Sequence, residues 1–276
     1  MILLFLLAAL QVFGKETVTC EIQGQLGNQM FQTAAAISFA LDNGYVALFP
    51  SLRQAINGQL NLQDVFYQLD ASEILDGGEW TNHSEAAYHS FAPIAFTQGK
   101  NLCLHGYFAH QKYFAHHGDF IRDLFAPRQE MLERIEAKYG VLLKGETVAL
   151  HVRTFLPDAI DPNNGIGRTK WDYYLEALEL FPEETAILVF TDSVEWVRNN
   201  FPLYRFNVHF IEGNSHTFDF YLMSRCSHQI ISPKSTYSWW AAWLNPNPDK
   251  IVIRPDIQDW IDEDGFPSSW LKIAVE

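Results

Sequence analysis

The last quarter of the chain holds the residues best suited to chemistry. Asp219 falls in the first turn of an apolar-striped helical segment, and residues 229–232 form a short β-rich run after it. A turn then leads to Ser235 and Thr236, which open a second helical segment. A helix N-terminus that follows a strand offers free N–H groups and a positive dipole end to an anion. This pattern predicts a diphosphate site, although an ordinary capped helix explains Ser235 and Thr236 more simply when they are taken alone.

Size and charge limit the classes of protein that the chain can belong to. Its 276 residues, 48% of them hydrophobic, can bury one large core or two ordinary ones, and we expect two domains. The formal net charge of -14 argues against a nucleic-acid partner, because phosphate neutralisation needs a basic face. An anionic ligand must therefore meet a local basic pocket, for which the candidates are Arg153, Arg168, Lys170, Arg225 and Lys234.

The sequence gives no sign of a disulfide framework or of a metal centre. Its three cysteines, Cys20, Cys103 and Cys226, lack metal-ligand spacing, so we expect reduced structural thiols. Residues 262–264 (Asp-Glu-Asp) fit a DxD pattern, which in some transferases binds a divalent ion. Acids beside a glycine in such a segment usually form a solvated loop, and we expect no bound metal.

The N-terminus has an apolar run over residues 1–13, within a segment that we set apart as residues 1–15. The run is too short for a membrane-spanning helix, which needs about 20 residues, but has the length of a signal-peptide core. No basic residue precedes it. A loose membrane anchor, a secretory signal and an over-extended start all remain open, so the predicted location is membrane-associated, with cytoplasmic and secretory alternatives.

Alternating strand and helix patterns predict an α/β fold. Residues 18–22 read as a strand, Gly24 and Gly27 as a turn, and Asn28 opens an alanine-rich helix that Gly44 ends. Residues 50–100 are irregular, and helical patterning returns over 118–138. From there strands are predicted at 148–152, 186–190, 208–211, 229–232 and 251–253, with helices at 171–180, 194–201 and after Ser235. Such alternation indicates parallel sheet with covering helices.

Several motifs occur in one order along the chain: GQLGNQMFQ from residue 24, GYFAHQKYF from 106, HVR from 151, VFTDSVEW from 189 and STYSWWAAWL from 235. Together they resemble the α-1,2-fucosyltransferases of glycosyltransferase family eleven, over residues 18–260. The resemblance implies two Rossmann-like domains facing across a cleft, the GT-B arrangement. We place an acceptor-side domain at residues 16–142 and a donor-binding domain at residues 143–276.

The resemblance also assigns roles to individual residues. It implies that His151 and Arg153 hold the GDP of a GDP-fucose donor, with Arg153 on the β-phosphate, and that Asp219 accepts hydrogen bonds from the guanine edge. Asn28 is expected at the transferred sugar or its phosphate, and Ser235 and Thr236 at the diphosphate. The simpler alternatives are a strand-end ion pair at His151 and Arg153, an N-cap at Asn28 and a dipole-favoured acid at Asp219.

One loop departs from the family pattern. Thr154 stands where a second arginine is usual, and Leu156 where an aspartate is usual. Asp158, Asp161, Arg168 and Lys170 are close enough in sequence to replace the missing charges, but spacing does not show that they do. The change could mean a different acceptor or weakened activity.

The predicted reaction moves L-fucose, with inversion, from GDP-fucose to a hydroxyl of a galactose-containing glycan. Arg153 and Asn28 are the expected catalytic residues, because the main task is to stabilise the charge that develops on departing GDP. No catalytic base is singled out among Asp158, Asp161 and Glu21. Two alternatives stay open: a transferase with another acceptor or linkage, and a non-catalytic protein that binds nucleotide sugar or glycan.

Trp239, Trp240 and Trp243 are expected in the core.

Overall fold

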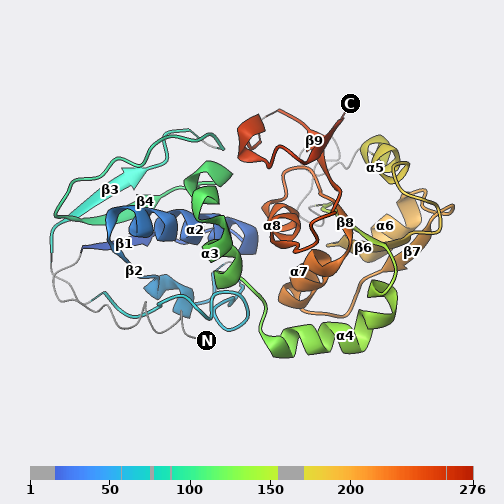
Figure 1. Cartoon of the computed structure of the whole chain (residues 1–276), viewed down its shortest axis with the longest axis horizontal. Coiled ribbons are helices and arrows are strands. Elements are labelled where there is room, and N and C mark those ends of the chain that lie inside the picture. The colour runs from blue at the N-terminus through green and yellow to red at the C-terminus, as the bar shows by residue number, and fades with distance from the viewer. Residues whose placement is uncertain are drawn as a thin grey trace.

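The computed structural model describes residues 16–56, 58–74, 78–87, 89–154, 171–258 and 260–275. The apolar segment 1–15 and the loop candidates Leu156, Asp158, Asp161, Arg168 and Lys170 lie outside these ranges. Among the described residues, no helix combines the length and the apolar character needed to cross a membrane. Figure 1 shows the chain as two α/β halves side by side, with α4 (Gln129–Leu143) lying along the second half, where the chain enters it from the first.

The first half is built on a four-stranded parallel sheet in the order β2-β1-β4-β3. Its elements are β1 (Thr17–Cys20), α2 (Leu26–Asn43), β2 (Val46–Ala47), β3 (Trp80–Ser84) and β4 (Asn101–His105). The predicted first strand and helix are present, but the helix begins at Leu26 rather than at Asn28. Strand β3 lies in the stretch predicted to be irregular, because its sequence WTNHS is mostly polar and its side chains alternate only between exposed and half-buried.

The second half is a six-stranded parallel sheet in the order β10-β9-β8-β5-β6-β7. This is the doubly wound order of dinucleotide-binding folds, which confirms the predicted Rossmann-like half. Its elements are β5 (Thr147–Val152), α5 (Trp171–Leu178), β6 (Ala186–Thr191), α6 (Val194–Asn200), β7 (Asn207–Phe210), α7 (His216–Arg225), β8 (His228–Ile230), α8 (Thr236–Leu244), β9 (Val252–Asp256) and β10 (Leu271–Ala274). The sequence pattern missed β10, which has one buried side chain.

The helical stretch predicted over residues 118–138 is two helices, α3 (Gly118–Leu124) and α4. Pro127 accounts for the break, because a proline lacks an N–H donor and disfavours helical geometry at the residue before it. Four 3₁₀ turns complete the described elements: η1 (Pro50–Arg53), η2 (Gln111–Tyr113), η3 (Ala115–His117) and η4 (Glu263–Gly265).

Aromatic packing between α2 and α8 joins the halves. Phe31 of α2 lies 4.7 Å from Trp239 and 5.0 Å from Trp240 between ring centroids, and Phe114 stacks on Trp240. Trp239, Trp240 and Trp243 are buried, as predicted. One hydrophobic cluster includes residues of both halves. The boundary placed at 142–143 falls between the two sheets and stays a prediction, since this core is continuous across it.

Candidate functional site

A cavity of about 490 Å³ lies where the two halves meet. This volume is within the range of small-molecule sites. The first half contributes residues 24–28 and Gln59 to its wall. The second half contributes the ends of β5 and β6, two residues of α7 and the start of α8. All six residues predicted for the donor site line the cavity: Asn28, His151, Arg153, Asp219, Ser235 and Thr236.

The position of the cavity follows from strand order. Strands β5 and β8 are neighbours at the centre of the second sheet, and the chain continues from β5 to β6 on one side and from β8 to β9 on the other. Loops after these two strands leave in opposite directions, which opens a crevice at their carboxyl ends. Arg153 follows β5 there, and its backbone N–H donates to Ser232 Oγ at 3.0 Å across the crevice.

Arg153 is held by a carboxylate at the end of the neighbouring strand. Its Nη1 donates to Asp192 Oδ2 at 2.7 Å, and both side chains are mostly shielded from solvent. Thr154 donates to the other oxygen of Asp192 through its backbone N–H and its hydroxyl, each at 2.8 Å. Thr154, one of the two residues that depart from the family pattern, is thus buried and orients Asp192. Asp192 in turn fixes the guanidinium at the cavity.

The N-terminus of α8 forms a second wall of the cavity. Ser235 is the N-cap, as the sequence predicts, and its side chain accepts from the N–H of Ser238 at 3.3 Å. The first N–H groups of the helix, on Thr236 and Tyr237, precede its hydrogen-bonded turns and lie in the cavity lining. Lys234 lines the same wall and has a left-handed backbone with φ of 56°. This wall therefore combines a helix dipole with a cation.

The N-terminus of α2 meets the N-terminus of α8. Asn28 Oδ1 accepts from the Thr236 hydroxyl at 2.8 Å, so Asn28 faces the other half and Gln25 is the N-cap of α2. The interpretation of Asn28 as an N-cap is therefore wrong. Gly27, predicted in a turn, lies in the helix, and a Cβ on it would come within 2.5 Å of the Thr236 carbonyl carbon. A glycine is needed because the two backbones almost touch.

His151 lines the cavity as a mostly buried, neutral imidazole. Burial lowers its pKa to about 3, which the charge of Asp192 opposes and that of Arg153 reinforces. Its Nδ1 is buried and has no hydrogen-bond partner among the described residues. A neutral ring with a spare nitrogen can form a hydrogen bond with a ligand, but it supplies no positive charge for a phosphate.

Asp219 lines the cavity from the first turn of α7. Its Oδ1 accepts from Asn214 Nδ2 at 2.8 Å, and Asn214 is held in turn by Lys138. Burial raises the pKa of Asp219, and the Asn214 hydrogen bond and the Lys138 charge offset part of that effect. A partly buried carboxylate with a free oxygen suits a ligand edge that has two adjacent N–H donors.

Other candidate residues lie elsewhere. Arg225 is exposed and lines a separate hollow beside α4, so it is wrong as a basic residue of the cavity. Trp196 stacks on Trp171 at 5.4 Å, outside the cavity lining. Glu21 pairs with His105 at the end of β4, at 2.9 Å. The three cysteines are free, and two of them are buried.

Two of the three acids in residues 262–264 are engaged with basic side chains. Asp264 pairs with His110 at 2.8 Å and with Lys112, and Glu263 pairs with Arg254. Within the described part of the chain these acids tie η4 to its surroundings.

Several residues of the lining were not singled out from the sequence, among them Gln25, Gln59, His216 and Tyr237. Gln59 Oε1 accepts from the Leu26 N–H at 3.3 Å, and the Tyr237 hydroxyl donates to the His216 carbonyl at 2.6 Å. No spacing rule links Gln59 to α2, because it comes from an irregular stretch 33 residues away. Tyr237 carried a usable signal, since it directly follows the predicted cap residues.

The profile of the family described as Glycosyl transferase family 11 matches residues 5–274. The chain belongs to this family. The match covers both halves and every residue of the cavity described above.

Three relatives match nearly the full chain. The O-antigen biosynthesis glycosyltransferase WbnK of Escherichia coli is 30% identical over 85% of this chain and 92% of its own length. An α-1,2-colitosyltransferase of E. coli is 28% identical over 93% and 98%. Galactoside α-(1,2)-fucosyltransferase 2 of rabbit, Oryctolagus cuniculus, is 27% identical over 88% and 75%.

A solved structure with the same fold is the fucosyltransferase NodZ from Bradyrhizobium. It superposes with a TM-score of 0.54 at 16% identity, covering 88% of this chain and 95% of its own. At this identity the likeness shows the fold alone, a pair of α/β halves of the GT-B type.

Proposed function

We propose that the protein is an inverting glycosyltransferase that moves L-fucose from GDP-fucose to the 2-hydroxyl of a galactose in a glycan. The observation that carries the proposal is the convergence of Arg153, the α8 N-terminus and Asp219 on one cavity at the switch point of the second sheet. Membership of family 11 and the names of the α-1,2-transferring relatives support the reaction class.

The donor fits the cavity by charge and by hydrogen bonding. The lining has two cations, Arg153 and Lys234, and two acids, Asp192 and Asp219. Because these formal charges cancel, the two convergent helix N-termini, each worth roughly half a positive charge, must help to neutralise the diphosphate. Asp192 is already used by Arg153, whereas Asp219 has an oxygen to accept from the guanine N1–H and amino group.

The chemistry needs stabilisation of a leaving group. As the anomeric bond breaks, charge collects on the GDP oxygens, where Arg153 and the hydroxyl of Ser235 donate hydrogen bonds. Thr236 donates there through its backbone N–H, because its hydroxyl already donates to Asn28. Asn28, fixed by Thr236 at the mouth of the first half, holds the transferred end of the donor. His151 donates or accepts a hydrogen bond as a neutral ring. The acceptor hydroxyl then attacks the sugar from the face opposite GDP, which inverts the anomeric centre.

The proposal assigns no metal to the diphosphate, since Arg153, Lys234 and the helix ends supply the positive charge. Its test is an assay of purified protein with labelled GDP-fucose and lactose, with and without a chelator. We expect transfer that survives the chelator and a product whose linkage analysis gives an α-1,2 bond. GDP-fucose binding without GDP release would instead support a non-catalytic binding protein, and another linkage would support the transferase with an altered acceptor.

A further inference from the structure

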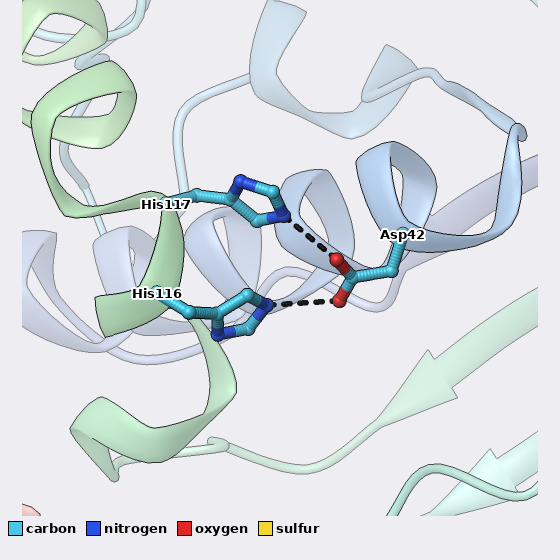
Figure 2. A group of neighbouring side chains, drawn as sticks. All are labelled: Asp42, His116 and His117. Carbon is cyan, nitrogen blue, oxygen red and sulfur yellow. Dashed lines mark hydrogen bonds and ion pairs between the residues drawn. The ribbon is translucent and has the colours of Figure 1, made fainter.

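A cluster of two histidines and an aspartate lies away from the cavity, at the opposite end of α2. His116 Nε2 is 2.9 Å from Asp42 Oδ2, and His117 Nε2 is 2.8 Å from Asp42 Oδ1. Figure 2 shows both rings pointing their outer nitrogens at the one carboxylate. The three potential ligand atoms lie within 4.8 Å of one another, and all three side chains are partly open to solvent.

The arrangement of the two histidines is unusual for neighbours in sequence. They are consecutive in η3, where successive side chains normally point in different directions, yet their rings lie 4.5 Å apart and face the same group. Ser38, a fully buried residue of α2, places its hydroxyl 3.1 Å from the same His116 Nε2, so an ion bound there would replace this contact as well as the one to Asp42.

The position of Asp42 also favours a cation. It lies in the last turn of α2, whose C-terminus has a partial negative charge, and that turn has no basic residue. An acid there is unfavourable unless positive charge lies close by. A divalent ion would interact favourably with both the carboxylate and the helix end.

We propose that Asp42, His116 and His117 bind a divalent transition metal of the zinc class. Two imidazole nitrogens and one carboxylate oxygen are a ligand set that zinc, cobalt(II) and nickel(II) accept, whereas magnesium and calcium prefer oxygen ligands. In this ligand set the ion takes the place of the protons that the two rings now share with Asp42. Three protein ligands leave a further position for water.

The site is structural, not part of the transfer reaction. Asn28 and Asp42 are 14 residues apart on α2, which is about 21 Å along a helix at 1.5 Å per residue. The ion would clamp the C-terminal end of α2 to η3, just before α3, and so hold the helix whose other end lines the cavity. The cluster differs from residues 262–264, where Glu263 pairs with Arg254 and Asp264 pairs with Lys112, two side chains that carry their own positive charge.

The test is a titration of the purified, metal-stripped protein with cobalt(II), followed by its visible ligand-field absorption, and with zinc, followed by calorimetry. We expect one ion per chain, without the near-ultraviolet band of a cobalt–thiolate bond, because the ligands are not cysteines. Zinc should raise the melting temperature, since an ion that binds only the folded chain stabilises it.

Matched variants decide whether these residues are the ligands. Asp42→Asn and His117→Gln should each weaken binding by about tenfold or more, and should remove the zinc-dependent rise in melting temperature. His105→Gln is the control, because His105 also pairs with a carboxylate, Glu21, but its other ring nitrogen contacts the side chain of Asn82. It should bind metal as tightly as the unaltered protein.

GDP binding serves as the check that each variant is folded, because the cavity is remote from Asp42. Two results would overturn the proposal: no saturable binding at millimolar metal, or affinity that Asp42→Asn and His117→Gln leave unchanged.

Discussion

The two halves line the same cavity with different chemistry. The second half provides charged and hydroxyl side chains at the ends of parallel strands, with Arg153 already fixed by Asp192. The first half provides mainly backbone and amides over residues 24–28, brought close by Gly27. We therefore expect recognition of a charged donor to depend on the second half. The first half would complete the cavity wall and orient the transferred sugar.

Arg153→Ala, in the second half, should cause the largest loss of activity of the changes considered. It removes the guanidinium that meets the diphosphate and, with it, the positive charge beside Asp192. Loss of one such donor costs about 10²–10³-fold in rate, and the negative charge of Asp192, no longer balanced by an arginine, repels the diphosphate, so transfer should be abolished in a GDP-release assay.

Arg198→Ala is the matched control, because Arg198 pairs with Glu212 on the surface of the same half. It should keep normal turnover. Near-normal activity of Arg153→Ala, with native circular dichroism, would refute the assignment of the donor site.

Asp219→Asn should weaken GDP-fucose binding by about 10–100-fold, because a hydrogen bond to a charged group contributes about 1.5–3 kcal/mol. It should also reduce the preference for guanine over adenine diphosphates, which competition binding measures. Asp249→Asn, at an exposed position, is the control. If the Asp219 variant and the control have the same preference for guanine over adenine, other residues recognise the guanine base.

Lowering the pH should weaken GDP-fucose binding, as Asp219→Asn does. The proposed contact needs the carboxylate form, and burial raises the pKa of Asp219, so affinity is full above that pKa and is lost as pH falls through it. The loss should begin at a higher pH than for an ordinary aspartate. GDP-fucose is the probe, because GDP has a terminal phosphate that titrates near pH 6.

His151 should cause no change in GDP-fucose affinity near neutral pH, since its pKa is about 3. An affinity profile that Asp219→Asn leaves unchanged in shape would exclude Asp219 as the titrating group.

Gly27→Ala tests how the first half contributes. The added methyl would lie 2.5 Å from the Thr236 backbone, so one helix N-terminus must move away from the other. Overpacking of this kind costs about 1–3 kcal/mol of stability, and the movement breaks the Asn28–Thr236 hydrogen bond. We expect a lower melting temperature and a larger loss in turnover than in GDP affinity. Gly145→Ala is the control, since its nearest neighbour would be 3.9 Å away.

The second half could be predicted from sequence more fully than the first. Apolar runs such as β5 and β6 are buried and continuous, so their type and order can be read directly. Strand β3 could not be found, because a polar edge strand with exposed side chains has no hydrophobic period. The cap at Ser235 was predictable from local preference alone.

Contacts between distant segments account for the rest of the site. Asn28 and Thr236 are 208 residues apart, and Gln59 reaches α2 from an irregular stretch. No local rule gives such pairings. The family resemblance pointed to the right residues, but only the fold places Gly27 against Thr236 and Thr154 beneath Asp192.

Thr154→Val should have the smallest effect, and it tests whether the second half positions Arg153 in advance. Valine keeps the shape but removes the hydroxyl that donates to Asp192, leaving the backbone N–H as donor. Such a hydrogen bond contributes about 0.5–1.5 kcal/mol, so kcat/KM for GDP-fucose should fall by about 2–10-fold. Thr154→Ser, which keeps the hydroxyl, should retain most activity. If serine and valine behave alike, the hydroxyl does not position Asp192, and the backbone alone fixes the arginine that the donor meets.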